Sequence, residues 1–421
     1  MAKDRSKQNE QSEAEKAERR ARNAANRARR EANAAAKEAR KAKKGKPPQK
    51  QKPPGKSRKP AETDAIVAPF AEISPQIVPF HSPADISNKF PINPEHFNIL
   101  LVVQGGRLEC EAALFVESLR QNAPGWQGRL ILAEPRPEGA WAGHTIGISA
   151  AARTILEGRG AEIIPFTAQH FGASYPYGNK IEALQTLPAG HDFMFFDSDT
   201  LITGPIEQMG IDFSRPAASM RREGSWPQPP LYGPDYSDIW KALYERFGLD
   251  FESSTDLSQP DEHWERYLYF NAGWFFVSDP AEFGQRFLDW AIAVRDDPGD
   301  ALASQELDPW LDQIILPLVI HSLGGGRPGP ELDGLDGQIS CHWRKLPLLY
   351  ARESDIAVEA LERAATAPDI QALLRGWEPA LRLIYQGHGR NALRPTIDRK
   401  RLPHREQPLR KQIKQAGWWV V

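Results

Sequence analysis

Large apolar side chains are absent from the first 62 residues of this chain of 421 residues. Residues 1–62 contain no Leu, Ile, Val, Phe, Tyr or Trp, so this segment has no face whose burial could offset the entropy of ordering it. We therefore expect residues 1–62 to form a disordered basic tail that ends in a Pro-rich linker. Residues 63–96 are expected to be an extended lead-in to a folded domain.

Cysteines and long hydrophobic runs are also scarce. Cys110 and Cys341 are too few and too far apart for a disulfide framework or a cysteine-based zinc site, which favours a reducing compartment. No apolar run approaches the ~18 residues needed to cross a bilayer. The N-terminus begins with charges and lacks the apolar stretch of a secretory signal. These absences predict a cytoplasmic protein without a membrane-spanning segment.

Charge is distributed unevenly along the chain. Residues 1–62 carry a net charge of +13, residues 63–389 carry −22 and residues 390–421 carry +7, although the whole chain is at −2. Basic ends favour peripheral contact with an anionic membrane at its inner surface, aided by Trp418 and Trp419, whose rings suit the membrane interface. The alternative is a solvated tail that folds back on the acidic body while the two tryptophans pack in the core. Nucleic acid is not favoured as a partner, because no aromatic residues interleave with the charges of the tail.

From residue 97 onward, short apolar runs alternate with amphipathic segments. This pattern is typical of an α/β fold with a mostly parallel sheet flanked by helices. The apolar runs predict strands over residues 98–103, 128–133, 161–166 and 191–196. Helical spacing predicts helices over residues 109–122, 148–157 and 179–187.

Two aspartates, Asp197 and Asp199, directly follow the fourth predicted strand. Ligands bind beyond the carboxyl ends of the strands in sheets of this class. Two carboxylates at this place can hold a divalent cation against the phosphates of a substrate. Acidic turn residues after strands are also common without any ligand, so the pair alone leaves both interpretations open.

The segments around these aspartates resemble a known superfamily. Residues 178–206 (GNKIEALQTLPAGHDFMFFDSDTLITGPI) resemble the central motif of GT-A nucleotide-sugar glycosyltransferases. Residues 269–277 (YFNAGWFFV) resemble the Phe-Asn-Ala/Ser-Gly strand of the same superfamily, especially its lipopolysaccharide-glycosyltransferase and glycogenin group. Residues 308–317 (DPWLDQIILP) resemble that group's Asp-Gln helix, and residues 383–390 (LIYQGHGR) resemble its closing strand and His-x-Gly segment.

This resemblance implies a GT-A-like catalytic domain over residues 97–390, followed by a basic C-terminal extension over residues 391–421. It also implies a nucleotide-diphosphate sugar as donor and a cation, Mn²⁺ or Mg²⁺, held by Asp197, Asp199 and a late histidine. The family segment usually continues with Lys-Pro-Trp, which is missing after Gly389. The third ligand is therefore open between His388 and His342, and His388 is preferred because of its position.

The resemblance assigns further site residues. Lys180 and Gly273 are expected to bind the donor, and Asn271, Asp312 and Gln313 are expected to act in catalysis. These residues also have simpler interpretations. Lys180 would then be a surface lysine and Gly273 a β-bulge glycine. Asn271 would be an amide bonded to backbone, and Asp312 an acidic residue near a helix N-terminus.

The sequence thus predicts a metal-dependent glycosyltransferase that moves a sugar to a hydroxyl acceptor on an envelope glycan, a glycolipid or a protein. Retention of configuration is implied only by the resemblance. The alternative is a non-catalytic nucleotide-sugar or glycan-binding protein that acts through its basic tail. A haloacid-dehalogenase-type phosphatase is disfavoured, since Leu201 stands where that motif needs Thr or Val. A P-loop is excluded because residues 324–327 lack its Lys-Ser/Thr.

Overall fold

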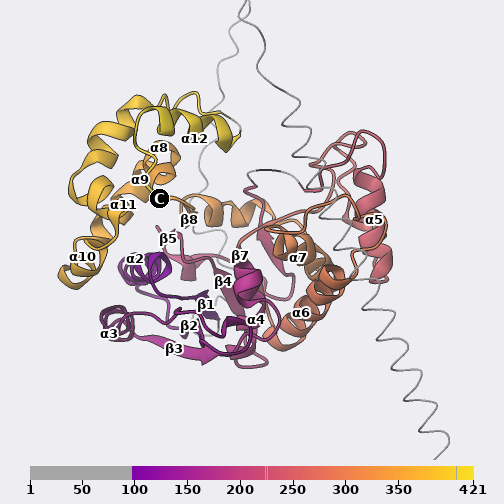
Figure 1. Ribbon diagram of the computed structural model, residues 1–421, viewed down its shortest axis with the longest axis horizontal. Coiled ribbons are helices and arrows are strands. Elements are labelled where there is room, and N and C mark those ends of the chain that lie inside the picture. Colours follow the sequence, from indigo (N-terminus) through magenta and orange to yellow (C-terminus); the bar gives the residue numbers. More distant parts are fainter. Residues whose placement is uncertain (1–96, 223, 225, 404) are drawn as a thin grey trace, which may run out of the picture. The chain divides into compact units, whose positions relative to one another are not determined.

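The computed structural model describes residues 97–421 except 223, 225 and 404 (Figure 1). The predicted tail (1–62) and the predicted lead-in (63–96) lie outside the described residues.

A six-stranded sheet forms the centre of the fold, in the order β3-β2-β1-β4-β7-β6. The first four strands in this order run parallel, whereas β7 runs antiparallel to both β4 and β6. The strands are β1 (Asn98–Val102), β2 (Leu130–Pro135), β3 (Ala161–Phe166), β4 (Phe193–Phe196), β6 (Ala217–Ser219) and β7 (Asn271–Val277). The predicted α/β class with a mostly parallel sheet is confirmed.

Helices cover both faces of this sheet, which explains why its central strands β1 and β4 are almost entirely apolar and buried. In β4, Phe196 contacts Phe115 of α2, while Phe193 contacts Phe283 of α6 on the opposite face. One face is covered by α2 (Arg107–Asn122) and α3 (Ala150–Gly158), and the other by α6 (Pro280–Asp296) and α7 (Leu311–Ser322) (Figure 1).

Two short strands form a second sheet next to the end of β4. Strand β5 (Thr200–Ile202) pairs antiparallel with β8 (Ser340–His342), with Thr200 opposite His342. The predicted helix over 179–187 is shorter than expected: α4 (Asn179–Glu182) continues only as a 3₁₀ turn to Thr186. The remaining helix before β7 is α5 (Tyr236–Arg246).

A layer of helices at the C-terminal end packs against α2 (Figure 1). Its members are α8 (Leu346–Arg352), α9 (Asp355–Ala364), α10 (Pro368–Leu374), α11 (Glu378–Ala380) and α12 (Glu406–Gln415). The closing strand expected within residues 383–390 is wrong, because residues 381–385 and 389–393 form π-helical turns. Leu383 and Leu393 are fully buried in the helical layer, so the apolar run that suggested a strand is a buried helical segment instead.

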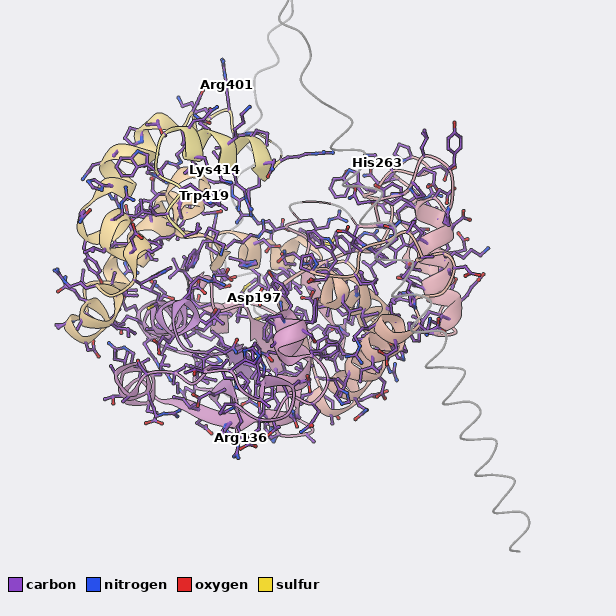
Figure 2. All side chains as sticks on the ribbon, in the orientation of Figure 1. Arg136, Asp197, His263, Arg401, Lys414 and Trp419 are labelled. Atoms are coloured by element: carbon purple, nitrogen blue, oxygen red, sulfur yellow. The ribbon has the colours of Figure 1, made fainter. Side chains whose placement is uncertain are left out.

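The two tryptophans near the C-terminus are half-buried against this helical layer. Trp418 contacts the ring of His388, and the ammonium group of Lys414 lies 5.4 Å from the ring centre of Trp419. Figure 2 shows Lys414 and Trp419 close together, with Arg401 pointing outward from the same layer. Within the described residues, none of the helices is both long and apolar enough to cross a membrane.

Candidate active site

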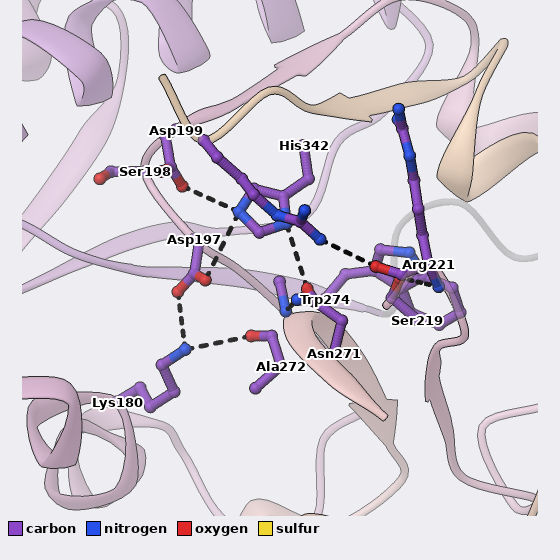
Figure 3. Close-up of polar contacts among 12 residues, drawn as sticks. Lys180, Asp197, Ser198, Asp199, Ser219, Arg221, Asn271, Ala272, Trp274 and His342 are labelled. Carbon is purple, nitrogen blue, oxygen red and sulfur yellow. Dashed lines mark hydrogen bonds and ion pairs between the residues drawn. The ribbon is translucent and has the colours of Figure 1, made fainter. Parts of the chain in front are cut away.

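Asp197 and Asp199 lie at the carboxyl end of β4 and face His342 (Figure 3). The β5–β8 pairing brings His342 there, and Trp343 N–H strengthens it by donating to Asp199 O at 2.9 Å. Nε2 of His342 is 3.1 Å from Asp199 Oδ1 and 3.8 Å from Asp197 Oδ2. One ligand atom from each of the three residues can be chosen so that all lie within 4.8 Å of one another.

His388, the preferred third ligand from sequence, is not among these residues. It lies against Trp418 in the C-terminal helical layer. In the structure it is therefore His342, and not His388, that lies next to the two aspartates. The physical reason is the short β5–β8 sheet, which joins segments that are far apart in sequence.

The orientation of His342 is set by Asn271 on β7. Nδ1 of His342 is 3.2 Å from Asn271 Oδ1, which also accepts the Gly273 N–H at 2.9 Å. An amide oxygen can only accept, so Nδ1 carries the proton in this contact and Nε2 is directed at the aspartates. Asn271 therefore has a protein partner, as its place in an apolar strand required.

Gly273 provides the space for this imidazole. A Cβ at residue 273 would lie 2.1 Å from His342 Nδ1, a distance that van der Waals repulsion forbids. Its carbonyl accepts the Asp197 N–H at 2.9 Å, so the same residue also aligns β7 with the end of β4.

The charges of the three residues are coupled. Burial alone would lower the pKa of His342, but the neighbouring Asp199 and Asp197 raise it above its usual value. Burial alone would raise the pKa of Asp199, yet His342 and Arg107 lower it to about 2. For Asp197, burial outweighs the attraction of Lys180 and raises the pKa. Without a cation, the site thus favours an imidazolium held by carboxylate.

Lys180 comes from α4 and lies beneath Asp197. Its Nζ is 2.9 Å from Asp197 Oδ1, 3.2 Å from Asp312 Oδ2 and 3.2 Å from the carbonyl oxygen of Ala272. Burial alone would lower the pKa of Lys180, but the two aspartates hold it above its usual value. Lys180 is therefore a buried cation and not a surface lysine.

Asp312 and Gln313 lie in the first turn of α7, on the far side of Lys180. Asp312 is fully buried and accepts a hydrogen bond from the Tyr175 hydroxyl at 2.7 Å. Burial and Asp312 together raise the pKa of that hydroxyl well above its usual value. Gln313 is half-buried and its Oε1 accepts from the Tyr269 hydroxyl at 3.2 Å. The structure thus places Asp312 in the lysine network and Gln313 beside it.

Sequence reasoning missed the residues on the other side of the aspartates. Arg107 and Glu111 form an ion pair at 2.5 Å on α2, and Glu111 also accepts from the Ser198 hydroxyl at 3.1 Å. Burial, together with repulsion from Asp199, raises the pKa of Glu111 to about 8. Their opposite charges at a spacing of four residues were a signal that could have identified the pair, but the predicted helix began only at residue 109 and left Arg107 outside it.

The two aspartates, Lys180 and Arg107 border an open cleft of about 280 Å³. Asp197 and Asp199 keep 28% and 17% of their side-chain surface exposed. The cleft is lined by Val102, Gln104, Arg107, Leu108, Pro176, Tyr177, Asn179, Lys180, Phe195, Asp197, Ser198 and Asp199.

Comparison with known proteins identifies the family. Residues 99–324, more than half of the chain, match the family described as the Rhodobacterales glycosyltransferase domain. The chain belongs to this glycosyltransferase family. The matched region of the glycosyltransferase contains both aspartates, Lys180 and Asp312, whereas His342 lies beyond it.

Solved structures of other glycosyltransferases show weaker likeness. The galactosyltransferase LgtC, in complex with donor and acceptor sugar analogues, is 14% identical to this chain, with a TM-score of 0.41. The match covers 66% of this glycosyltransferase and 99% of LgtC. The bifunctional glycosyltransferase WbbM is 12% identical with a TM-score of 0.41, over 68% of this chain and 52% of WbbM. GlyE of Streptococcus pneumoniae is 11% identical with a TM-score of 0.37, over 68% of this chain and 63% of GlyE. A search of curated proteins finds no match. The assignment therefore rests on the family match.

Proposed function

We propose that the protein transfers a sugar from a nucleotide-diphosphate sugar to a hydroxyl acceptor, with a divalent cation held by Asp197, Asp199 and His342. The observation that carries this proposal is the cluster of these three side chains beside an open cleft at the carboxyl end of β4. In α/β sheets this edge is where phosphate-containing ligands bind.

The donor set suits a divalent cation. Two carboxylates and one imidazole converge, and the contact between Nδ1 and Asn271 leaves Nε2 to face the carboxylates. Carboxylates suit Mg²⁺ and Mn²⁺, while the nitrogen ligand favours Mn²⁺ over Mg²⁺, which prefers oxygen ligands. When bound, such a cation offsets the negative charge that develops on the departing diphosphate.

The surrounding residues position this set. Lys180 fixes Asp197 and opposes the rise that burial causes in its pKa, and Asp312 in turn holds Lys180. Asn271 orients His342, and Gly273 gives it room. Within the described part of the chain, the amide nitrogen of Gln313 makes no hydrogen bond, so we assign to Gln313 the contact with the sugar.

We further propose that the acceptor lies on an envelope glycan, a glycolipid or a protein, and that the basic ends bring the protein to an anionic membrane surface. The C-terminal residues support this idea: residues 390–421 carry a net charge of +7. In α12, Ile413 is buried, whereas Lys411 and Lys414 are exposed.

The decisive experiment measures binding of UDP, GDP and ADP by calorimetry with Mn²⁺ and with EDTA. One of these nucleotides is expected to bind the native protein in a Mn²⁺-dependent manner. Asp197→Asn and Asp199→Asn should each abolish the Mn²⁺ dependence, because each removes a charged ligand. Asp289→Asn on the exposed face of α6 is the matched control and should bind like the native protein. Unchanged Mn²⁺-dependent binding in both site variants would refute the proposal.

A further inference from the structure

Two basic side chains line the cleft. Either of them can bind a diphosphate only through hydrogen-bond donors that the protein does not already use. These side chains are Lys180 and Arg107. They sit on opposite sides of the two aspartates, since Lys180 contacts Asp197 and Arg107 lies 3.8 Å from Asp199 Oδ2. Their hydrogen bonds differ in a way that decides which can bind an anion.

Lys180 has no donor left for a substrate. An ammonium group has three N–H bonds, and Asp197, Asp312 and the Ala272 carbonyl occupy them at 2.9, 3.2 and 3.2 Å. Only 8% of the Lys180 side chain is exposed. A phosphate oxygen could bind Lys180 only by breaking one of these bonds and leaving a buried acceptor unpaired.

Arg107 is in the opposite situation. Its Nη1 donates to Glu111, while within the described part of the chain its Nε and Nη2 have no hydrogen-bond partner. The side chain is 38% exposed and lines the cleft. A guanidinium group has five N–H bonds in a rigid fork that matches the geometry of a phosphate. Arg107 thus has both the exposure and the unused donors that Lys180 lacks.

Glu111 fixes where this guanidinium points. Its side chain has no exposed surface; one carboxylate oxygen binds Arg107 at 2.5 Å and the other accepts from Ser198 at 3.1 Å. Ser198 lies between Asp197 and Asp199, so a single buried carboxyl group connects Arg107 to the loop that carries both aspartates. Arg107 is also the first residue of α2, whose N-terminal end favours negative charge.

We infer that Arg107, and not Lys180, contacts the diphosphate of the donor, and that Glu111 is a positioning residue that aims Arg107 into the cleft. This inference rests on the proposed function. The ligand it specifies is a nucleoside diphosphate, bound at the edge of the guanidinium that Glu111 leaves free.

The test is calorimetric binding of the nucleotide that the native protein prefers among UDP, GDP and ADP, in Mn²⁺, to Arg107→Gln. Loss of a charge-assisted contact is expected to weaken binding by about 10- to 100-fold. Binding of the corresponding nucleoside, which has no phosphate, should not change. The matched control is Arg129→Gln. Arg129 also pairs with a glutamate, Glu162 at 2.6 Å, but it lies directly before β2, at the amino ends of the parallel strands and away from the two aspartates.

The outcomes separate this inference from the proposed function. If none of the three nucleotides binds the native protein, the proposed function fails. If the native protein binds and Arg107→Gln binds equally well, the inference is overturned. Should Arg107→Gln not fold, as judged by thermal unfolding, Arg107→Lys keeps a charge for Glu111 but loses the fork. That variant is expected to bind several-fold more weakly, and unchanged binding would again overturn the inference.

Discussion

At the scale of single residues, the site depends on the absence of a side chain at residue 273. The imidazole of His342 lies where a Cβ at that residue would be, so the two residues exclude each other sterically. Asn271 then fixes the ring by its contact with Nδ1. The direction of Nε2 is therefore determined by two residues of β7 and not by His342 itself.

Gly273→Ala should accordingly displace His342 and weaken Mn²⁺ binding by about 10- to 100-fold, the usual cost of disturbing a group that orients a metal ligand. Electron paramagnetic resonance titration of free Mn²⁺ measures this. Gly210→Ala is the control, because a Cβ at residue 210 meets no atom within 4 Å. Equal Mn²⁺ affinity in the two variants would show that the site tolerates movement of His342.

The raised pKa of His342 predicts how cation binding depends on pH. Mn²⁺ must displace the proton from the imidazole, whereas Asp199, with a pKa of about 2, stays ionised above pH 5. Mn²⁺ affinity should therefore rise from pH 6 to pH 8, by up to about tenfold per unit below the pKa of His342. Over the same range the metal-free protein should lose stability, because a raised pKa stabilises the fold only while the group is protonated.

Histidine variants provide the controls for this pH profile. His342→Ala should bind Mn²⁺ more weakly and with little pH dependence between pH 6 and pH 8. His388→Ala should keep the native profile, since His388 packs on Trp418. The reverse order would return the third ligand position to His388.

At the scale of helices and strands, the apolar runs predicted the sheet well. The runs at 98–103 and 161–166 became β1 and β3. Strand β1 is covered on both faces and is therefore apolar almost throughout, whereas β3 lies at the end of the sheet and exposes Glu162 and Pro165. The run at 383–385 was misassigned because a buried helical turn is equally apolar. His342 could not be placed from sequence, since the β5–β8 pairing depends on tertiary contacts that no local pattern encodes.

Helix α12 is joined to the segment after His342 by ion pairs around one buried carboxylate. Glu406, the first residue of α12, is 4% exposed and binds Arg344 at 3.2 Å, Arg352 at 3.5 Å, and Arg410. Arg344 lies two residues after His342. This ion-pair cluster thus couples the C-terminal helix to the candidate active site.

Glu406→Gln should destabilise the protein by about 3 kcal/mol, because it removes the buried carboxylate that three guanidinium groups share. Urea unfolding measures the change. Glu378→Gln is the matched control: Glu378 is 72% exposed and pairs with Arg382 at 3.6 Å, so its loss should change stability by less than about 0.5 kcal/mol. If both variants unfold at the same urea concentration, the cluster does not stabilise the fold.

At the scale of the whole molecule, charge separates the ends from the body. Residues 63–389 carry a net charge of −22, while residues 1–62 and 390–421 carry +13 and +7. An anionic surface would attract the ends and repel the body, so binding would also orient the protein. Since Trp418 and Trp419 are half-buried, the attraction is expected to be mainly electrostatic.

Flotation with liposomes that contain anionic lipid tests this orientation. The full chain should float at low salt and be released as salt shortens the Debye length to ~10 Å at 0.1 M. A chain lacking residues 1–62 should float less, and liposomes of neutral lipid serve as the control. Equal flotation with and without residues 1–62 would show that the tail is not a membrane anchor.

The pairing of β5 with β8 also affects which genes can be recognised as encoding a complete glycosyltransferase of this family. A gene truncated after residue 324 would still encode the whole matched domain, both aspartates included, and would be recognised as a member of the family. Its product would lack His342 and the strand that aligns β5. An inventory of genomes based on the domain alone would therefore count such fragments as enzymes, although they lack one of the residues proposed to hold the cation.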